Sequence, residues 1–120
     1  MVKEWDISER TFDFALRIIN LYTYLEKKSG AARILGQQIL RSGTSVGANI
    51  EEAQGAQSRA DFISKYSIAR KEARETRYWL RLLVVSKTIS GLKTKELLQE
   101  IEELIKIITT IILRSKENQI

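Results

Sequence analysis

Apolar residues recur every three or four positions along four stretches of the chain, a spacing that places them on one face of an α-helix. Short glycine-containing segments separate the stretches, and the chain contains no proline that would kink a helix. Four long helices joined by short turns predict an all-α fold, an up-down-up-down four-helix bundle that forms a single domain over residues 1–120. The predicted helices cover roughly residues 8–28, 31–57, 59–87 and 94–116.

The first predicted helix is apolar around about half of its circumference. We expect Ser8 to cap its start, because a serine oxygen accepts a hydrogen bond from the free amide groups of a first turn. Its apolar face joins Phe12, Leu16 and Ile19, and a neighbouring row that starts at Phe14 widens this face. A helix this broadly apolar needs to be covered on more than one side.

The second predicted helix has an inward face that is unusually small and polar. The helix also contains Gly43 and Gly47, four residues apart on another face, and each interior glycine costs about 1 kcal/mol relative to alanine. The inward row keeps its phase across both glycines, which favours close packing of a neighbouring backbone over a break in the helix. Ser42 and Asn49 lie on that row, and we expect them to hydrogen-bond across the bundle and fix the helix register.

The third and fourth predicted helices differ in how clearly the sequence specifies them. Ser58 and Asp61 have the spacing of a capping box before the third helix, with Asp in place of the usual Glu or Gln. The fourth contains the run from Leu104 to Leu113, which is rich in β-branched residues and is also compatible with a strand. The length of the segment and the phase that it shares with Leu97 favour a helix.

Cysteine and histidine are both absent, which narrows the chemistry open to the chain. Without them there is no disulfide, no thiolate nucleophile and no imidazole to bind a metal or act as a base. No glycine-rich phosphate-binding loop occurs. Glu72 and Glu75 share one side of a helix, where we expect a surface or interface role. The composition predicts a protein that is not an enzyme and has no catalytic residue, metal or cofactor.

No stretch of the sequence indicates a membrane partner. The most apolar run, Leu104 to Leu113, is ten residues long and contains Lys106, so it is too short to cross a bilayer. The first twelve residues mix both charge signs, unlike a signal peptide. We expect a cytoplasmic protein.

The net charge of +5 is concentrated in one helix. Residues 58–87 hold eight cationic and three acidic side chains, a net +5 that equals that of the whole chain. Five arginines of this segment fall within about 60° on a helical wheel. Neighbours at i,i+4 repel one another by a few tenths of a kcal/mol, so another interaction has to favour them. These residues, which we call the arginine face, are Arg59, Arg70, Arg74, Arg77 and Arg81.

Three explanations of the arginine face remain open at this point. Guanidinium groups suit phosphate, so the face would bind a polyanion such as RNA or DNA. The arginines would instead form salt bridges with glutamates of the same or a neighbouring subunit, or lie solvated without a partner. Tyr78 and Trp79 would stack on bases, but aromatic residues beside a core face are more often packing residues. The glutamates available for salt bridges are Glu51, Glu52, Glu96, Glu100 and Glu103.

Two motifs in the middle of the chain carry a family resemblance. They are RSGTSVGANI at residues 41–50, followed by Glu-Ala, and IARKEARETRYWL at residues 68–80. Together they resemble the bacterial four helix bundle protein family, also called the ribosomal-RNA intervening-sequence or S23-type family. The resemblance extends over roughly residues 8–115.

The resemblance assigns structural or interface roles to individual positions. Glu72 departs from the family pattern, since many relatives have a small residue such as Ser there, so packing of this helix would differ. The positions that match the pattern are Arg41, Ser42, Ser45, Ala48, Asn49, Glu52, Glu75 and Trp79.

The resemblance also implies an assembly and a class of partner. Members form four-helix bundles that assemble as ring-like homopentamers, and some are encoded inside insertions in the large-subunit ribosomal-RNA gene. The family is similar to the accessory protein of diversity-generating retroelements, which binds nucleic acid and a reverse transcriptase. No enzymatic activity is established for it. A ring would cover the excess apolar surface of the first helix and would multiply the positive charge into a strong field for a polyanion.

Overall fold

The computed structural model describes residues 4–88 and 91–117, which form four α-helices and no strand within those ranges. Ser90-Gly91, the glycine-containing segment expected between the third and fourth helices, lies partly outside the described ranges. The β-branched segment that also suited a strand is helical throughout. The helices are α1 (Glu4–Leu25), α2 (Ala31–Gln54), α3 (Arg59–Ser86) and α4 (Leu92–Glu117).

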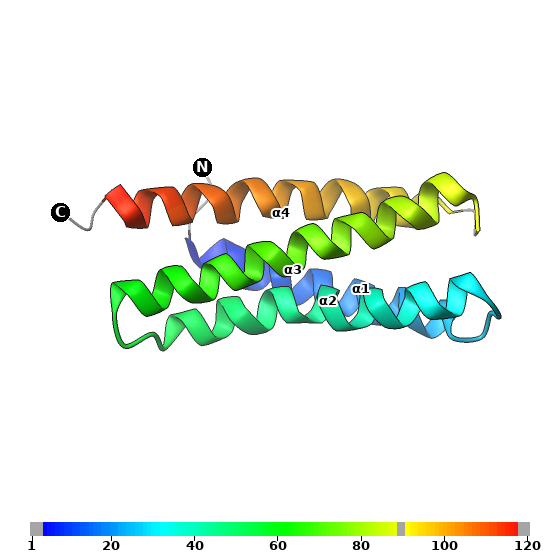
Figure 1. Cartoon of the computed structure of the whole chain (residues 1–120), viewed down its shortest axis with the longest axis horizontal. Coiled ribbons are helices and arrows are strands. Elements are labelled where there is room, and N and C mark those ends of the chain that lie inside the picture. Colours follow the sequence, from blue (N-terminus) through cyan, green and yellow to red (C-terminus); the bar gives the residue numbers. More distant parts are fainter. Residues whose placement is uncertain (1–3, 89–90, 118–120) are drawn as a thin grey trace.

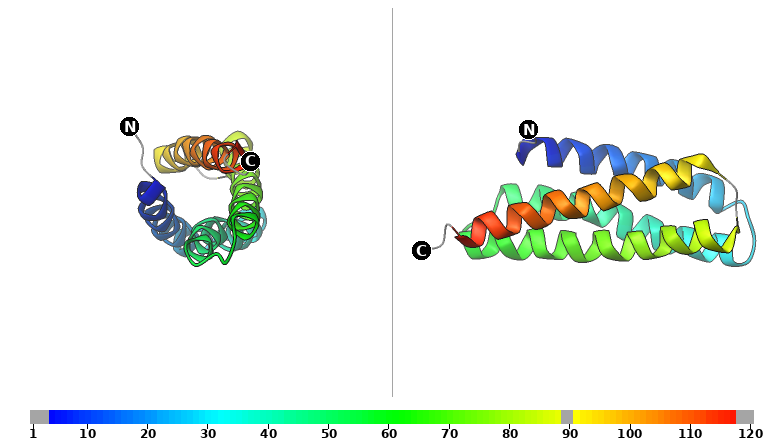
Figure 2. Two further views of the ribbon diagram at one scale, coloured as in Figure 1. Left: turned by 90° about the vertical axis from the view of Figure 1, so that its left-hand side faces the viewer. Right: turned by 90° about the horizontal axis from the view of Figure 1, so that it is seen from above.

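The four helices lie side by side in an elongated bundle measuring 51 × 24 × 19 Å (Figure 1). Viewed along the long axis, they follow one another around the bundle in chain order, so that α4 returns to the side of α1 (Figure 2). The contacts agree with this arrangement: α1 and α3 each pack against both α2 and α4. Helix α3 therefore has two flanks, one beside α2 and one beside α4.

Helix α1 differs from its prediction at its start, and the bundle buries one of its two apolar rows while the other stays exposed. It begins at Glu4, so Ser8 lies inside the helix and does not cap it. The buried row contains Phe14 and Ile18, together with Ile7, one residue before the predicted start. Phe12, by contrast, is 67% exposed. A half-apolar helix has two edges, and within this chain the bundle covers the edge that contains Phe14.

Helix α2 confirms the close packing predicted at its glycines. The helix runs unbroken through Gly43 and Gly47. A Cβ at Gly43 would lie 2.9 Å from Ile18 Cγ1 of α1, and one at Gly47 would lie 3.2 Å from the Thr11 carbonyl oxygen. Glycine lets the backbones of α1 and α2 approach to a distance that a methyl group would prevent.

The predicted polar contact across the bundle holds for Ser42 and fails for Asn49. Ser42 is fully buried; its Oγ donates to the Gln38 carbonyl at 3.0 Å and accepts from Thr76 Oγ1 of α3 at 2.8 Å. Asn49 is half-buried and donates to the Ser45 carbonyl of its own helix at 2.9 Å. The Ser42–Thr76 pair therefore joins α2 to α3, whereas the Asn49 amide satisfies a backbone group within α2.

Helix α3 begins as its capping motif predicts. Ser58 Oγ accepts a hydrogen bond from the Asp61 amide at 3.0 Å, and the Asp61 carboxylate accepts one from the Gln57 amide at 3.3 Å. The helix ends at Ser86, where Lys87 adopts a left-handed conformation with φ of 56°. These two ends fix the segment that carries the arginine face.

Candidate functional site

The arginine face lies along the flank of α3 that is directed toward α4. Arg59 marks this flank, because its Nη1 donates to the Ser115 carbonyl near the end of α4 at 3.4 Å. Arg74 and Arg81 are exposed, and Arg70 and Arg77 are half-buried. From Arg70 to Arg81 the helix rises about 16 Å, so four guanidinium groups line one short surface.

No described residue forms a salt bridge or hydrogen bond with the side chains of Arg70, Arg74, Arg77 or Arg81. The glutamates expected to pair with them within a subunit are engaged elsewhere or remain apart. Glu100 and Glu103 of α4 bind Arg10 of α1, and Glu52 of α2 binds Lys65 at 3.2 Å. Glu51 and Glu96 form no salt bridge with a described residue.

The flank of α3 beside α2 holds the opposite charge. Arg41 of α2 contacts Glu72 at 3.3 Å and also contacts Glu75. The Trp79 indole donates to the Glu75 carboxylate at 3.2 Å. Glu72 is only 13% exposed at its side chain, so this departure from the family pattern supplies Arg41 with a second, largely covered carboxylate. The cluster fastens α3 to α2 and keeps its two carboxylates away from the arginine face.

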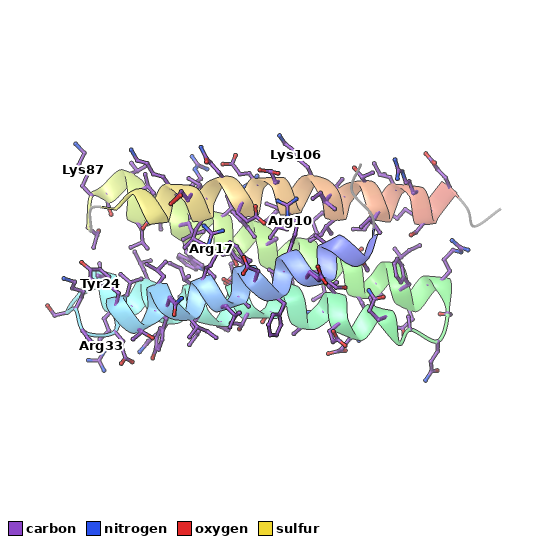
Figure 3. The ribbon with its side chains drawn as sticks, turned by 180° about the vertical axis from the view of Figure 1, so that it is seen from behind. Arg10, Arg17, Tyr24, Arg33, Lys87 and Lys106 are labelled. Atoms are coloured by element: carbon purple, nitrogen blue, oxygen red, sulfur yellow. The ribbon has the colours of Figure 1, made fainter. Side chains whose placement is uncertain are left out.

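Arg10 is held by glutamates on the side of α1 that faces α4 (Figure 3). Its Nε and Nη2 donate to the two oxygens of Glu100 at 3.1 and 2.7 Å, and Nη2 also reaches Glu103 at 3.2 Å. The hydrogen bonds to Glu100 raise the pKa of Arg10 above its ordinary value, although partial burial acts in the opposite direction. Glu100 and Glu103, which were expected to pair with the arginines of α3, therefore form the α1–α4 contact instead.

The polar positions of the family motif mainly satisfy backbone groups within α2. Ser45 Oγ donates to the Arg41 carbonyl at 2.7 Å, which parallels the bonds of Ser42 and Asn49 to carbonyls four residues earlier. Ala48 is exposed on the same helix. Arg41 and Ser42 of this motif, together with Glu52 just after it, contact another helix, and all three reach α3.

Tyr78 does not pack as expected for an aromatic residue beside the core face. It is 53% exposed, whereas Trp79 packs against the core. The Tyr78 ring meets the Trp79 ring edge-on, with centroids 5.1 Å apart. Tyr78 lies one turn from both Arg74 and Arg81, and this spacing to the arginines was the available signal.

The arrangement is suited to binding negative charge and does not present a metal centre. Guanidinium groups donate paired hydrogen bonds to phosphate or carboxylate oxygens. Within residues 4–88 and 91–117, no group of three or more acidic side chains is placed to hold a metal ion. In that part of the chain, no helix is both long and apolar enough to span a bilayer.

Comparison with known proteins places the chain in a family. The model of the 23S rRNA-intervening sequence protein family matches residues 3–110. A solved structure from Bacteroides thetaiotaomicron, a protein of unknown function from the S23 ribosomal protein family, is 44% identical with a TM-score of 0.81. The similarity covers 88% of this chain and 97% of that chain. No curated protein matches. The family match over most of the length, with a solved relative of the same fold, shows that the chain belongs to the 23S rRNA-intervening sequence protein family.

Proposed function

We propose that this protein is a non-enzymatic cytoplasmic bundle that binds the phosphate backbone of RNA or DNA through its arginine face. The observation that carries the proposal is the absence of any described acidic partner for Arg70, Arg74, Arg77 and Arg81. Four unneutralised guanidinium groups on one helix repel one another, and a polyanion removes that repulsion. The family's association with ribosomal-RNA intervening sequences adds support.

Binding through phosphate contacts has a defined signature. Phosphate contacts position a protein on nucleic acid without reading the bases, so the affinity would depend little on sequence. Each contact also releases counterions, so the affinity would fall steeply with salt. The alternative partner that we propose for the same face is a nucleic-acid-processing enzyme, such as a reverse transcriptase.

Fluorescence anisotropy with labelled RNA and DNA, from about 50 to 200 mM salt, tests the proposal. We expect a dissociation constant on the order of micromolar at the lower salt. The triple variant Arg74→Gln, Arg77→Gln, Arg81→Gln should reduce the salt slope on duplex DNA by up to about 3, one phosphate contact per arginine.

The matched control removes the same charge from surfaces away from the arginine face. Lys27→Gln, Arg33→Gln and Arg114→Gln change three exposed cations outside α3. This variant should keep most of the affinity. Equal losses in the two triple variants would mean that net charge alone binds the polymer, and no binding by the wild type would remove the proposal.

A second candidate function, a structural oligomer, is favoured by the exposed side of α1. Phe12, Leu16 and Ile19 are 67%, 48% and 44% exposed and follow one another at helical spacing. Burial of such a row against another subunit would be favourable by about 25 cal/mol per Å². We propose a homo-oligomer, a ring-like pentamer by family resemblance, in which the arginines would pair with acidic residues of a neighbouring subunit.

Light scattering separates the two candidates. A wild-type mass several times 13.8 kDa, reduced by Leu16→Ser with Ile19→Ser but not by the control Ile34→Ser, supports assembly through α1. If Arg74→Ala also dissociates the assembly and the wild type binds no nucleic acid, the arginines act between subunits. A wild-type mass of 13.8 kDa would exclude the oligomer.

A further inference from the structure

The exposed side chain of Tyr78 bears on whether the arginine face binds single-stranded or double-stranded nucleic acid. We propose that the face takes single-stranded nucleic acid, with one base stacked on Tyr78 and the neighbouring phosphates held by Arg74, Arg77 and Arg81. The inference rests on the proposed function and narrows its ligand. The proposed site combines the aromatic side chain of Tyr78 with the cationic side chains of Arg74 and Arg81, which lie one helical turn before and after it.

The position of Tyr78 meets the geometric needs of a stacking platform. Arg74 lies four residues before it and Arg81 three residues after it, so all three side chains emerge from adjacent turns of the same face. Tyr78 is 53% exposed. Its ring and the Trp79 ring meet at 70° with centroids 5.1 Å apart, and the Trp79 indole donates to Glu75, so the Tyr78 ring has a fixed neighbour.

The arginines do not themselves cover the Tyr78 ring. Among the described residues, the one cation placed over an aromatic ring is Lys28 on Tyr24, at the far end of α1. A guanidinium group stacked on Tyr78 would have blocked the place of a base. The ring is therefore open beside side chains that bind phosphate, the combination found on surfaces that bind single strands.

A duplex would leave this ring without a partner. In a double helix the faces of the bases are stacked on one another, and only phosphates and base edges reach the surface. A single strand exposes the faces of its bases, and stacking on an aromatic ring then adds to the phosphate contacts regardless of sequence. Tyr78 should therefore contribute to binding of a single strand and not of a duplex.

An apolar continuation of this surface suggests a competing occupant. Leu82 and Val85 follow Tyr78 at helical spacing and are 37% and 73% exposed. A protein helix that covered all three would use Leu82 as much as Tyr78. The charge favours the strand, because the cationic residues surround Tyr78 and the two aliphatic residues lie toward the end of α3.

The test compares a labelled single-stranded 20-mer with the matching duplex, each from about 50 to 200 mM salt, using the full chain. Tyr78→Ala should weaken binding of the single strand about 5- to 100-fold and leave its salt slope unchanged. Duplex affinity should not change. Tyr78→Phe keeps the ring and should retain the wild-type preference, and Leu82→Ala, a truncation on the same face, should change neither affinity.

The outcomes distinguish failure of this inference from failure of the proposed function. If the wild type binds both polymers and Tyr78→Ala alters both equally or neither, the arginine face still binds phosphate but the stacking inference is wrong. If Leu82→Ala weakens binding of the single strand as much as Tyr78→Ala, the loss is not specific to the aromatic ring and the stacking inference is wrong. If the wild type binds neither polymer, both proposals are wrong. Circular dichroism melts of each variant confirm that the fold is retained.

Discussion

The contact between Gly43 of α2 and Ile18 of α1 gives a quantitative test of why α2 carries glycine at its centre. A methyl group at Gly43 would lie 2.9 Å from Ile18 Cγ1 and 3.0 Å from Cγ2, closer than carbon atoms normally approach. Both atoms are near the α1 backbone, so they cannot swing aside as a side-chain tip can. Gly43→Ala therefore requires either a shift of α1 or a strained Ile18 rotamer.

Two opposing effects set the size of the change. Alanine is favoured over glycine within a helix by about 1 kcal/mol. Overpacking a well-filled site costs about 1–3 kcal/mol. Gly43→Ala should therefore lower the free energy of unfolding by about 1 kcal/mol. Ile18→Ala alone leaves a cavity at a fully buried position and should cost about 3 kcal/mol.

The double variant separates these effects. Ile18→Ala removes both clashing atoms, so Gly43→Ala in that background gains helix propensity and fills part of the cavity. The two substitutions together should cost about 2 kcal/mol less than the sum of the single effects. Urea unfolding followed by circular dichroism, at one protein concentration for all four forms, measures this coupling.

A matched cycle provides the control. Leu83 is buried in α3, and it is not among the atoms that a Cβ at Gly43 would meet. Gly43→Ala combined with Leu83→Ala should be additive. Additivity in the Gly43–Ile18 cycle as well would refute the argument that Ile18 is the reason for glycine at this position.

Three further substitutions test individual contacts by urea unfolding. Ser58→Ala removes the cap that accepts from Asp61 and should cost about 1 kcal/mol; an unchanged midpoint would contradict its role. Thr76→Val keeps the shape but removes the bond to Ser42, which still donates to a backbone carbonyl, so a loss of about 1 kcal/mol is expected and no loss counts against the pair. Arg10→Met should cost about 1 kcal/mol. The pKa of Arg10 is raised in the folded state. The stabilisation that its charge provides is therefore complete at any pH below the ordinary pKa of arginine, and it is lost only when the pH rises through the pKa of the folded state. The difference in free energy of unfolding between Arg10→Met and the wild type should therefore stay constant between neutral and mildly alkaline pH. A difference that shrinks over this range would contradict the role of the Arg10 charge.

Periodicity predicted the helices and the close packing at the α2 glycines, because both follow from the apolar row of a single helix. An apolar row that keeps its phase through Gly43 and Gly47 indicates a continuous helix, whatever packs against it. Periodicity left open which apolar row of α1 the bundle covers, since the wheel shows how wide an apolar face is without showing which edge a neighbour covers, and Phe12 lies on the exposed edge. The expected cap at Ser8 was wrong, because nothing in the sequence showed that the helix already begins at Glu4.

The polar contacts were harder to predict because they depend on which helix lies beside each flank. Glu100 was a plausible partner for the arginines of α3, yet it lies on the α1 side of α4 and binds Arg10. Asn49 shares the inward row with Ser42, but its longer side chain reaches back to a carbonyl of its own helix. In both cases the residue type was right for a hydrogen bond; the partner was decided by the order of helices around the bundle for Glu100 and by the reach of the side chain for Asn49.

That order also explains how an acidic helix surface and a basic one coexist on α3 without neutralising each other. Lys71 and Glu75 are four residues apart and would form an intrahelical pair on an isolated helix. In the bundle, Arg41 of α2 contacts Glu75 and Glu72 together, and Trp79 donates to the same Glu75 carboxylate. The α2 contact thus holds the two carboxylates on the flank away from Arg74 and Arg77. Negative charge that neutralises the arginine face would then come from another molecule, either the nucleic-acid strand that we propose or a neighbouring subunit, and without such a molecule the face stays solvated.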